Sequence, residues 1–228
     1  MARPIIVSIC SLTGLVRLEW AIAFRQQIVP FGRDVIISII ERSSPVSAAR
    51  NLAIYEAQKR DAKYMLFWDD DLIPRLTNAF AQLIGTMDNV LEATLVGSVC
   101  PIRREPAEPV VVKEEGGGAW YGWRDGKIHP VYSSGTAFLL IRMEDLEDID
   151  VPEIEIEGDI VKQYFSEYSS IKDEPVSDDF YLAELMAKHN KLWLVHGGVV
   201  CHQIDQDKKW YKVVGEEDFK PIEDIVAV

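Results

Sequence analysis

Three consecutive aspartates, Asp69, Asp70 and Asp71, follow the apolar residues 64–68. Adjacent carboxylates repel one another, and a closing fold keeps them ionised only if a cation compensates their charge. In an extended backbone Asp69 and Asp71 project to the same side, so both can face one ion. A divalent ion such as Mn²⁺ or Mg²⁺ accepts oxygen ligands and completes its shell with water and substrate phosphates. The triplet therefore predicts a metal site that recruits a diphosphate, and a solvated acidic turn is the alternative.

The elements around the triplet alternate between strands and helices, which predicts an α/β fold with a mainly parallel sheet. Strands are expected over residues 5–10, 35–40, 64–68, 95–100, 134–141 and 192–201, and helices over 15–28, 46–60, 77–91 and 178–189. Glycine and proline punctuate residues 103–130, which predicts hairpins and loops there. Ligands of open α/β sheets bind beyond the carboxyl ends of the strands, where the triplet would lie.

The composition is that of an ordinary globular protein of 228 residues, with 48% hydrophobic and 27% charged residues, and it favours one α/β domain. Its net charge of −13 argues against a nucleic-acid partner, and an anionic ligand would need a metal or a few placed cations. No apolar run approaches the roughly 18 to 20 residues of a membrane span, so we expect a cytoplasmic protein. Cys10, Cys100 and Cys201 lack metal-binding spacing and are expected to be reduced, buried thiols.

Four segments in a fixed order resemble the nucleotide-sugar-dependent glycosyltransferases of the GT-A fold, and are broadly similar to family 2. They are IIVSIC, SPVSAARNLAIYEAQKRDAKYMLFWDDDLIP, SSGTAFLLI and SDDFYLAELMAKHNKLWLVHGGVVCHQ. Together they extend over most of the chain, from about residue 5 to residue 202. The resemblance implies a Rossmann-like GT-A domain over residues 1–204.

The resemblance also implies that different parts of that domain bind different substrates. Residues 1–101 would bind the nucleotide-diphosphate sugar, 102–204 would bind the acceptor, and 205–228 would form a carboxyl-terminal tail or lid. Asp69 and Asp71 would occupy the metal-binding Asp-x-Asp positions. The donor would be a UDP- or GDP-sugar, the acceptor a glycan, lipid-linked or protein hydroxyl, and transfer would invert the anomeric configuration. Homo-oligomers are compatible with this expectation.

Further site residues come from the ends of the expected elements. Asp178 and Asp179 follow Ser177 and open a helix, where acidic residues are favoured by the helix dipole alone. By the resemblance, Asp179 or its neighbour Asp178 would remove the acceptor proton. His202 follows the apolar GVVC and resembles the position of a further metal ligand. A structural histidine is the alternative for His202.

Five residues complete the predicted binding site for the nucleotide-sugar. The resemblance places Arg50 and Asn51 near the nucleotide or the acidic triplet, and an exposed helical arginine is the alternative. Glu41 would contact the base or ribose, and Asp70 lies within the triplet itself. Lys209 belongs to a cationic cluster that would fold over the diphosphate.

Three other functions are compatible with parts of the pattern. A nucleotidyltransferase would need a glycine-rich, basic loop after the first strand, and residues 11–15 (SLTGL) are a poor version of it. A phosphatase with an aspartyl nucleophile usually has a small, flexible residue after the aspartates, which Leu72 and Ile73 are not. A non-catalytic carbohydrate- or nucleotide-binding protein with the same fold would need none of the catalytic groups.

Overall fold

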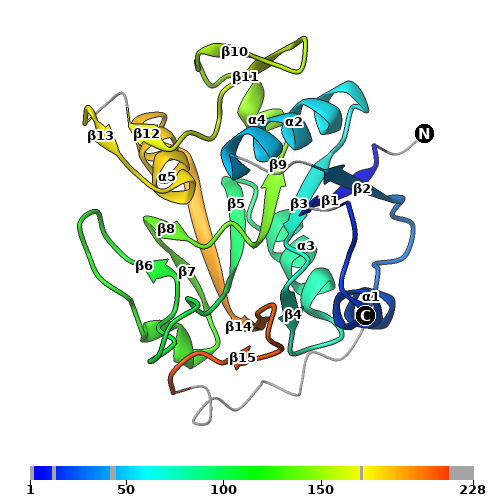
Figure 1. Cartoon of the computed structure of the whole chain (residues 1–228), viewed down its shortest axis with the longest axis vertical. Helices are drawn as coiled ribbons and strands as arrows, with labels where there is room; N and C mark the ends of the chain where they lie inside the picture. The colour runs from blue at the N-terminus through cyan, green and yellow to red at the C-terminus, as the bar shows by residue number, and fades with distance from the viewer. Residues whose placement is uncertain (1–2, 12–13, 42–44, 170–171, 216–228) are drawn as a thin grey trace.

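The computed structural model describes residues 3–11, 14–41, 45–169 and 172–215, except for the side chain of Glu41. Figure 1 shows a central sheet with helices on both faces. Among the described residues, no helix is long and apolar enough to cross a membrane. The architecture is the mixed α/β arrangement that the sequence predicts.

The sheet consists of nine strands, which are β1 (Ile5–Ser11), β2 (Val35–Glu41), β3 (Tyr64–Trp68), β4 (Leu72–Pro74), β5 (Ala93–Val99), β7 (Ile128–Pro130), β9 (Phe138–Arg142), β14 (Leu192–Ile204) and β15 (Trp210–Tyr211). The α-helices are α1 (Leu18–Gln26), α2 (Val46–Lys59), α3 (Ala79–Asn89), α4 (Glu144–Glu147) and α5 (Asp178–Lys188). Small ladders and a 3₁₀ helix, η1 (Gly122–Asp125), lie outside the sheet. The ladders join β6 (Val111–Val112) to β8 (Ser133–Ser134), β10 (Glu153–Ile156) to β11 (Asp159–Lys162), and β12 (Tyr168–Ser169) to β13 (Glu174–Pro175).

The main path of the sheet runs β15-β14-β5-β9-β3-β1-β2. β1 pairs in parallel with β2 and β3, and β14 pairs in parallel with β5. β9 lies between β3 and β5 and is antiparallel to both. β4 and β7 are antiparallel to β14. The carboxyl ends of β1, β3 and β5 therefore face the same edge of the sheet, and the acidic triplet lies there.

One predicted strand differs from the structure in its extent. The strand expected over residues 134–141 is two strands, because β8 pairs with β6 and only β9 joins the central sheet. Gly135 separates them, and its N–H donates to the carbonyl of Val110 at 2.9 Å. The apolar pattern of 138–141 predicts a strand but not where the chain leaves the smaller ladder.

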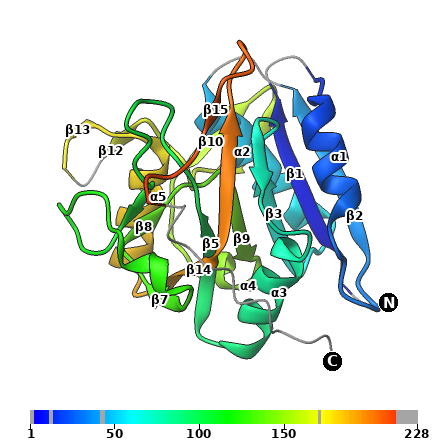
Figure 2. The same cartoon turned by 90° about the horizontal axis from the view of Figure 1, so that it is seen from below.

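Two hydrophobic clusters fix the helices to the two faces of the sheet (Figure 2). On one face, Trp20 of α1 and Phe80 of α3 pack with Trp68 of β3. On the other, Ile54 of α2 and Leu182 of α5 pack with strand residues of the same sheet. Since α2 and α5 share one face, their amino-terminal halves can be brought together at the edge where the triplet lies.

The chain after β14 folds back on the sheet as far as it is described. Trp210 and Tyr211 pair antiparallel with β14, and Val213 is buried. Residues 216–228 lie outside the described residues, so the lid over 205–228 stays a prediction. None of the three cysteines forms a disulfide, and Cys10 is half-buried where a buried thiol was expected.

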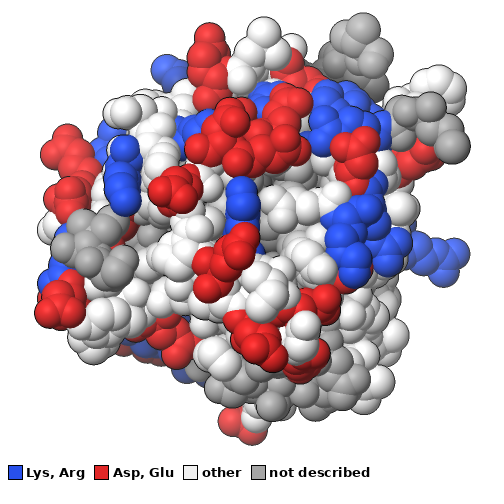
Figure 3. All heavy atoms as spheres, turned by 90° about the horizontal axis from the view of Figure 1, so that it is seen from above, with Lys and Arg blue, Asp and Glu red and all other residues white. Residues whose placement is uncertain are grey.

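Charges are distributed unevenly over the surface. The face in Figure 3 carries both acidic and basic side chains, in patches of either sign. The net charge of −13 therefore does not make this face uniformly negative.

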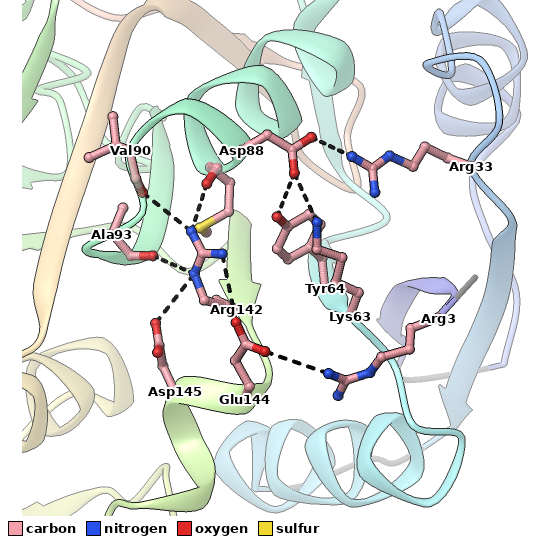
Figure 4. A network of polar contacts seen from close by, with 11 residues as sticks. Arg3, Arg33, Lys63, Tyr64, Asp88, Val90, Ala93, Arg142, Glu144 and Asp145 are labelled. Carbon is pink, nitrogen blue, oxygen red and sulfur yellow. Dashed lines mark hydrogen bonds and ion pairs between the residues drawn. The ribbon is translucent and has the colours of Figure 1, made fainter. Parts of the chain in front are cut away.

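A buried arginine ties β9 to the neighbouring helix at the end of the sheet away from the triplet (Figure 4). Arg142 donates to the carbonyls of Met87, Val90 and Ala93 at 2.6, 3.3 and 3.1 Å, and its Nε lies 3.5 Å from Asp145. A buried guanidinium requires partners for its N–H groups, and backbone carbonyls supply most of them here.

The adjacent carboxylate of Asp88 is equally well satisfied. It accepts hydrogen bonds from the Tyr64 hydroxyl at 2.6 Å and from Lys63 at 3.0 Å, and it pairs with Arg33 at 2.5 Å. Burial alone would raise the pKa of Asp88, but the hydrogen bonds from Tyr64 and Lys63 and the charge of Arg33 outweigh burial and lower it.

Candidate functional site

The acidic triplet forms a tight turn between β3 and β4. The Leu72 N–H donates to the Asp69 carbonyl at 3.1 Å, and the Trp68 indole donates to the Leu72 carbonyl at 2.9 Å. The expectation of an extended backbone at the triplet is wrong. Leu72 is fully buried in the core, so the chain must turn directly after β3 to return it there.

Arg50 connects the turn to the opposite side of the cleft. Its side chain is buried, and it forms ion pairs with Asp69, at 3.4 Å, and with Asp178. The guanidinium lies 5.8 Å from the ring centre of Phe67 and 5.7 Å from that of Phe165. The alternative of an exposed helical arginine is therefore wrong. Arg50 joins residues of β3, α2 and α5 in one cluster.

Asp71 is the most buried member of the triplet, with 3% of its surface exposed. Its Oδ2 accepts hydrogen bonds from Arg103 and from the Gln203 amide, the latter at 3.3 Å. Its Oδ1 is also buried but has no hydrogen-bond partner among the described residues. An unpaired buried carboxylate oxygen costs free energy, so this atom is prepared for a partner that the protein itself does not supply.

The pKa values of all three aspartates of the triplet are raised. Burial raises the pKa of Asp69 to about 7, Arg50 opposes the rise, and the charges of Asp71, Asp178 and Asp70 add to it. Burial also raises the pKa values of Asp70 and Asp71. Each carboxylate would be more easily ionised with a further positive charge nearby.

A cleft of about 260 Å³ opens beside the turn. Its walls are Arg50, Leu72, Cys100, Pro101, Ile102, Arg103, Val110, Gly135, Thr136, Ala137, Asp178, Asp179 and Gln203. It lies beyond the carboxyl ends of β3 and β5, the position at which open α/β sheets bind ligands. The structure thus brings Arg50, Asp178 and Asp179 to one cleft, whereas the three aspartates of the triplet are not among its lining residues.

Asp178 and Asp179 differ in how they are held at the start of α5. Asp178 is paired with Arg50, and its Oδ1 accepts from the Asp179 N–H at 3.1 Å. Asp179 Oδ1 accepts from the Ser177 hydroxyl and from the Phe180 N–H at 3.0 Å. Ser177 stands at the N-cap position, but its hydroxyl makes no capping hydrogen bond. The acids themselves therefore satisfy part of the helix start.

Asn51 has a positioning contact that the sequence did not indicate. Its Oδ1 accepts from the N–H groups of Tyr164 and Phe165, and its Nδ2 donates to the Phe165 carbonyl, all at 2.9 Å. Asn51 thereby fixes the backbone whose Phe165 ring packs against Arg50. Its predicted contact with the nucleotide stays a prediction.

The three predicted metal ligands are not assembled as a set. Within the described residues, no group of three His, Cys, Asp or Glu side chains is arranged to hold a metal. His202 pairs with Ile73 across the β14–β4 ladder, and its ring lies 6.2 Å from that of Trp210. Because alternate residues of a strand face opposite sides, Gln203 contacts Asp71 and His202 points the other way.

The remaining predicted residues lie around the turn or away from it. Asp70 is half-buried within the turn. Lys209 pairs with Glu105 at 3.1 Å and is half exposed. Glu41 is the last residue of β2, and its side chain lies outside the described part of the structure. Their contacts with a nucleotide stay predictions.

Gln203 is the site residue that sequence reasoning missed. It is buried and donates to Asp71, yet a glutamine near the end of a strand carries no distinctive pattern. Arg103 also donates to Asp71, a contact that its position after a strand does not indicate.

Comparisons with known proteins show which solved structures have a similar fold. No protein-family model and no curated protein matches the sequence. Among solved structures, A197 from STIV aligns with a TM-score of 0.59 and 16% identity over 92% of this chain and 94% of its own. GalNAc-T7, crystallised with UDP, GalNAc and Mn²⁺, aligns with a TM-score of 0.51 and 9% identity over 93% of this chain. The chain has a GT-A-type fold.

This GT-A-type chain spans 45% of the length of GalNAc-T7, so the alignment concerns only part of that protein. The predicted Rossmann-like architecture is confirmed at the level of the fold. Fold similarity at such low identity does not show what individual residues do. The chemistry of the site therefore follows only from the side chains of this chain.

Proposed function

We propose that the protein is a metal-dependent glycosyltransferase that moves a sugar from a nucleotide-diphosphate sugar to an acceptor hydroxyl with inversion. The observation that carries this proposal is Asp71 Oδ1, a buried carboxylate oxygen without a partner among the described residues, in the turn beside the cleft. The GT-A-type fold supports it, because GalNAc-T7, which shares that fold, was crystallised with a nucleotide, a sugar and Mn²⁺.

The donor set of the turn suits a divalent cation, Mn²⁺ or Mg²⁺. Asp71 would hold it through its unpaired oxygen and Asp69 would be the second ligand. His202, the third ligand expected from the sequence, points away from Asp71 and is not part of the proposed set. When bound, the ion supplies positive charge to the leaving diphosphate. Two carboxylates suffice for such an ion because water and substrate phosphates complete its coordination shell.

The carboxylates of α5 have separate tasks in this proposal. Asp179 lines the cleft and is not paired with Arg50, so it accepts the proton of the incoming acceptor hydroxyl. Asp178 is held by Arg50 and fixes the start of the helix relative to the acidic turn. Arg50 thus keeps the proposed base and the proposed metal ligands in a constant relation, which favours a single reactive geometry.

The test is a screen of UDP- and GDP-sugars for release of free nucleotide with and without Mn²⁺, which requires no knowledge of the acceptor. The wild-type protein should release nucleotide slowly from one donor, and only with metal. Asp71→Asn should lower that rate by about a hundredfold or more, because one metal ligand loses its charge. The matched control is Asp88→Asn, the same change in the network of Figure 4.

Four outcomes would contradict the proposal. Release that does not depend on metal, or an Asp71→Asn variant as active as Asp88→Asn, removes the acidic turn from the reaction. Binding of a nucleotide-sugar without any release favours a non-catalytic binding protein. Release of pyrophosphate from a nucleoside triphosphate favours a nucleotidyltransferase.

A further inference from the structure

We propose that Arg103 is an exchangeable counter-cation: it neutralises Asp71 in the metal-free protein, leaves when a divalent ion binds Asp71, and then binds the diphosphate of the donor. The inference rests on the proposed function above. It gives Arg103 two roles: it competes with the metal ion for Asp71, and it binds the diphosphate of the donor. The two roles can be measured separately.

The two arginines of the acidic turn are held in opposite ways. Arg50 is buried, packs between two aromatic rings and pairs with two carboxylates. The side chain of Arg103 is 53% exposed, and Asp71 is the only carboxylate with which it pairs in the described part of the chain. A buried arginine that leaves its partners loses two counter-charges without reaching water, whereas Arg103 is already half in solvent and leaves only one carboxylate. Arg103 can therefore leave and Arg50 cannot.

Hydrogen bonds hold the backbone of the loop that contains Arg103, residues 100–110. Its ends are joined by the Val110 N–H to the Cys100 carbonyl at 2.8 Å and by the Ile102 N–H to the Glu108 carbonyl at 2.9 Å. Only the side chain of Arg103 has to rotate, while the backbone stays in place. The long, flexible stem of an arginine permits this rotation without a change of fold.

The contact on Asp71 is incomplete in a way that a metal would correct. Arg103 and Gln203 both donate to Oδ2, and the buried Oδ1 has no partner in the described structure. A small cation with a higher charge can contact a carboxylate oxygen that the guanidinium leaves unpaired. The two cations would then repel each other at Asp71, and this repulsion releases the more exposed one.

The released side chain has an anion to bind. Among the residues that line the cleft, Arg50 and Arg103 are the only ones with a permanent positive charge, and Arg50 is already paired with two carboxylates. A guanidinium forms two parallel hydrogen bonds with a phosphate group. Arg103 is thus the cation of this cleft that can contact a diphosphate in an otherwise acidic protein.

The first measurement is metal binding alone. Metal-free protein is titrated with MnCl₂, and free Mn²⁺ is followed by its electron paramagnetic resonance signal. Arg103→Gln removes the competitor, so it should bind Mn²⁺ about twofold to fivefold more tightly than wild type, as expected for loss of a partly exposed ion pair. The matched control is Arg104→Gln, because Arg104 is the next residue, is exposed and pairs with Glu108. It has the same change of net charge and should bind Mn²⁺ like wild type.

The second measurement is nucleotide binding at saturating Mn²⁺, with UDP and GDP as probes. Arg103→Gln should bind the preferred nucleotide about tenfold more weakly, the loss expected for one charge-assisted phosphate contact. Arg104→Gln should bind it like wild type. Opposite signs of the two effects in one variant distinguish exchange from a structural role, which would weaken both affinities together.

The outcomes separate this inference from the proposed function. If wild type and Arg103→Gln bind Mn²⁺ equally, the exchange is overturned while the metal site stands. If wild type, Arg103→Gln and Arg104→Gln all fail to bind Mn²⁺, the metal-dependent function is overturned, and the exchange is overturned with it. If Arg103→Gln binds Mn²⁺ more tightly but nucleotide normally, Arg103 competes with the metal and the diphosphate contact is wrong.

Discussion

Two arginine-centred networks lie at opposite ends of β3, and they use the same residue types for different purposes. Around Arg142 and Asp88, backbone carbonyls, the Tyr64 hydroxyl and the cations Lys63 and Arg33 satisfy the charges, and the pKa of Asp88 is lowered. Around Arg50 and Asp71, carboxylates crowd one another, and the pKa of Asp69 is raised to about 7. The first network stabilises the fold, and the second retains electrostatic strain that a ligand can relieve.

The largest difference should come from removing the arginine of the structural network. Arg142→Gln leaves the carbonyls of Met87, Val90 and Ala93 without their donor, so we expect the free energy of unfolding to fall by about 3 to 5 kcal/mol. Urea unfolding measures it, with the exposed Arg60→Gln as a control that should unfold like wild type. A loss below about 1 kcal/mol would show that this network does not anchor β9.

A smaller effect with a characteristic pH dependence is expected for Asp88→Asn. A carboxyl whose pKa is lowered by folding stabilises the native state above its unfolded pKa of about 4, and this contribution is lost as the pH falls through the folded pKa. The variant should be less stable than wild type by about 1 kcal/mol at pH 7, and the difference should shrink below about pH 4.

Urea unfolding at pH 7, 5 and 3.5 tests this prediction. Glu92→Gln is the control, because Glu92 is exposed close to α3 and the same change of charge there should not alter the pH dependence. A difference between Asp88→Asn and wild type that is equal at all three pH values would mean that ionisation of Asp88 does not stabilise the fold.

The smallest effect on stability is expected for Asp71→Asn, although Asp71 is more buried than Asp88. The change relieves charge crowding while it weakens the pair with Arg103, so the free energy of unfolding should stay within about 1 kcal/mol of wild type. Thermal unfolding with Mn²⁺ sharpens the contrast. Metal should raise the melting temperature of wild type and of Asp88→Asn but not of Asp71→Asn.

Two results would contradict this difference between the two networks. If Asp71→Asn costs more than about 2 kcal/mol without metal, the acidic turn is held together by its ion pairs in the same way as the Asp88 network. If Mn²⁺ stabilises all three proteins equally, the ion binds elsewhere.

Much of the fold follows from the sequence because its strands are short, apolar and separated by helices of clear periodicity. Residues 64–68 form a strand at the predicted limits, and α2 ends one residue from its predicted end. The antiparallel direction of β9 was not predictable, since a short apolar run has the same pattern in either direction. Its place between β3 and β5 depends on contacts that are distant in sequence.

The site was predictable in its residue types and less so in its contacts. The aspartates and the start of α5 were recognised from their positions after a strand and at the start of a helix, and Arg50 was given by the resemblance to glycosyltransferases. The burial of Arg50 depends on Phe165, and the orientation of Asp71 depends on Gln203, more than 100 residues away in each case. Local patterns contain no information about such pairs, because they arise only when the layers pack.

The ion pair between Arg50 and Asp178 joins residues separated by 128 positions. During synthesis the ribosome releases the acidic turn long before it releases α5, Arg103 or β14. The emerging amino-terminal half therefore carries the charges of the triplet without most of their partners. The contacts of the acidic turn are therefore complete only after the chain through β14 has been made, because both halves of the chain supply them.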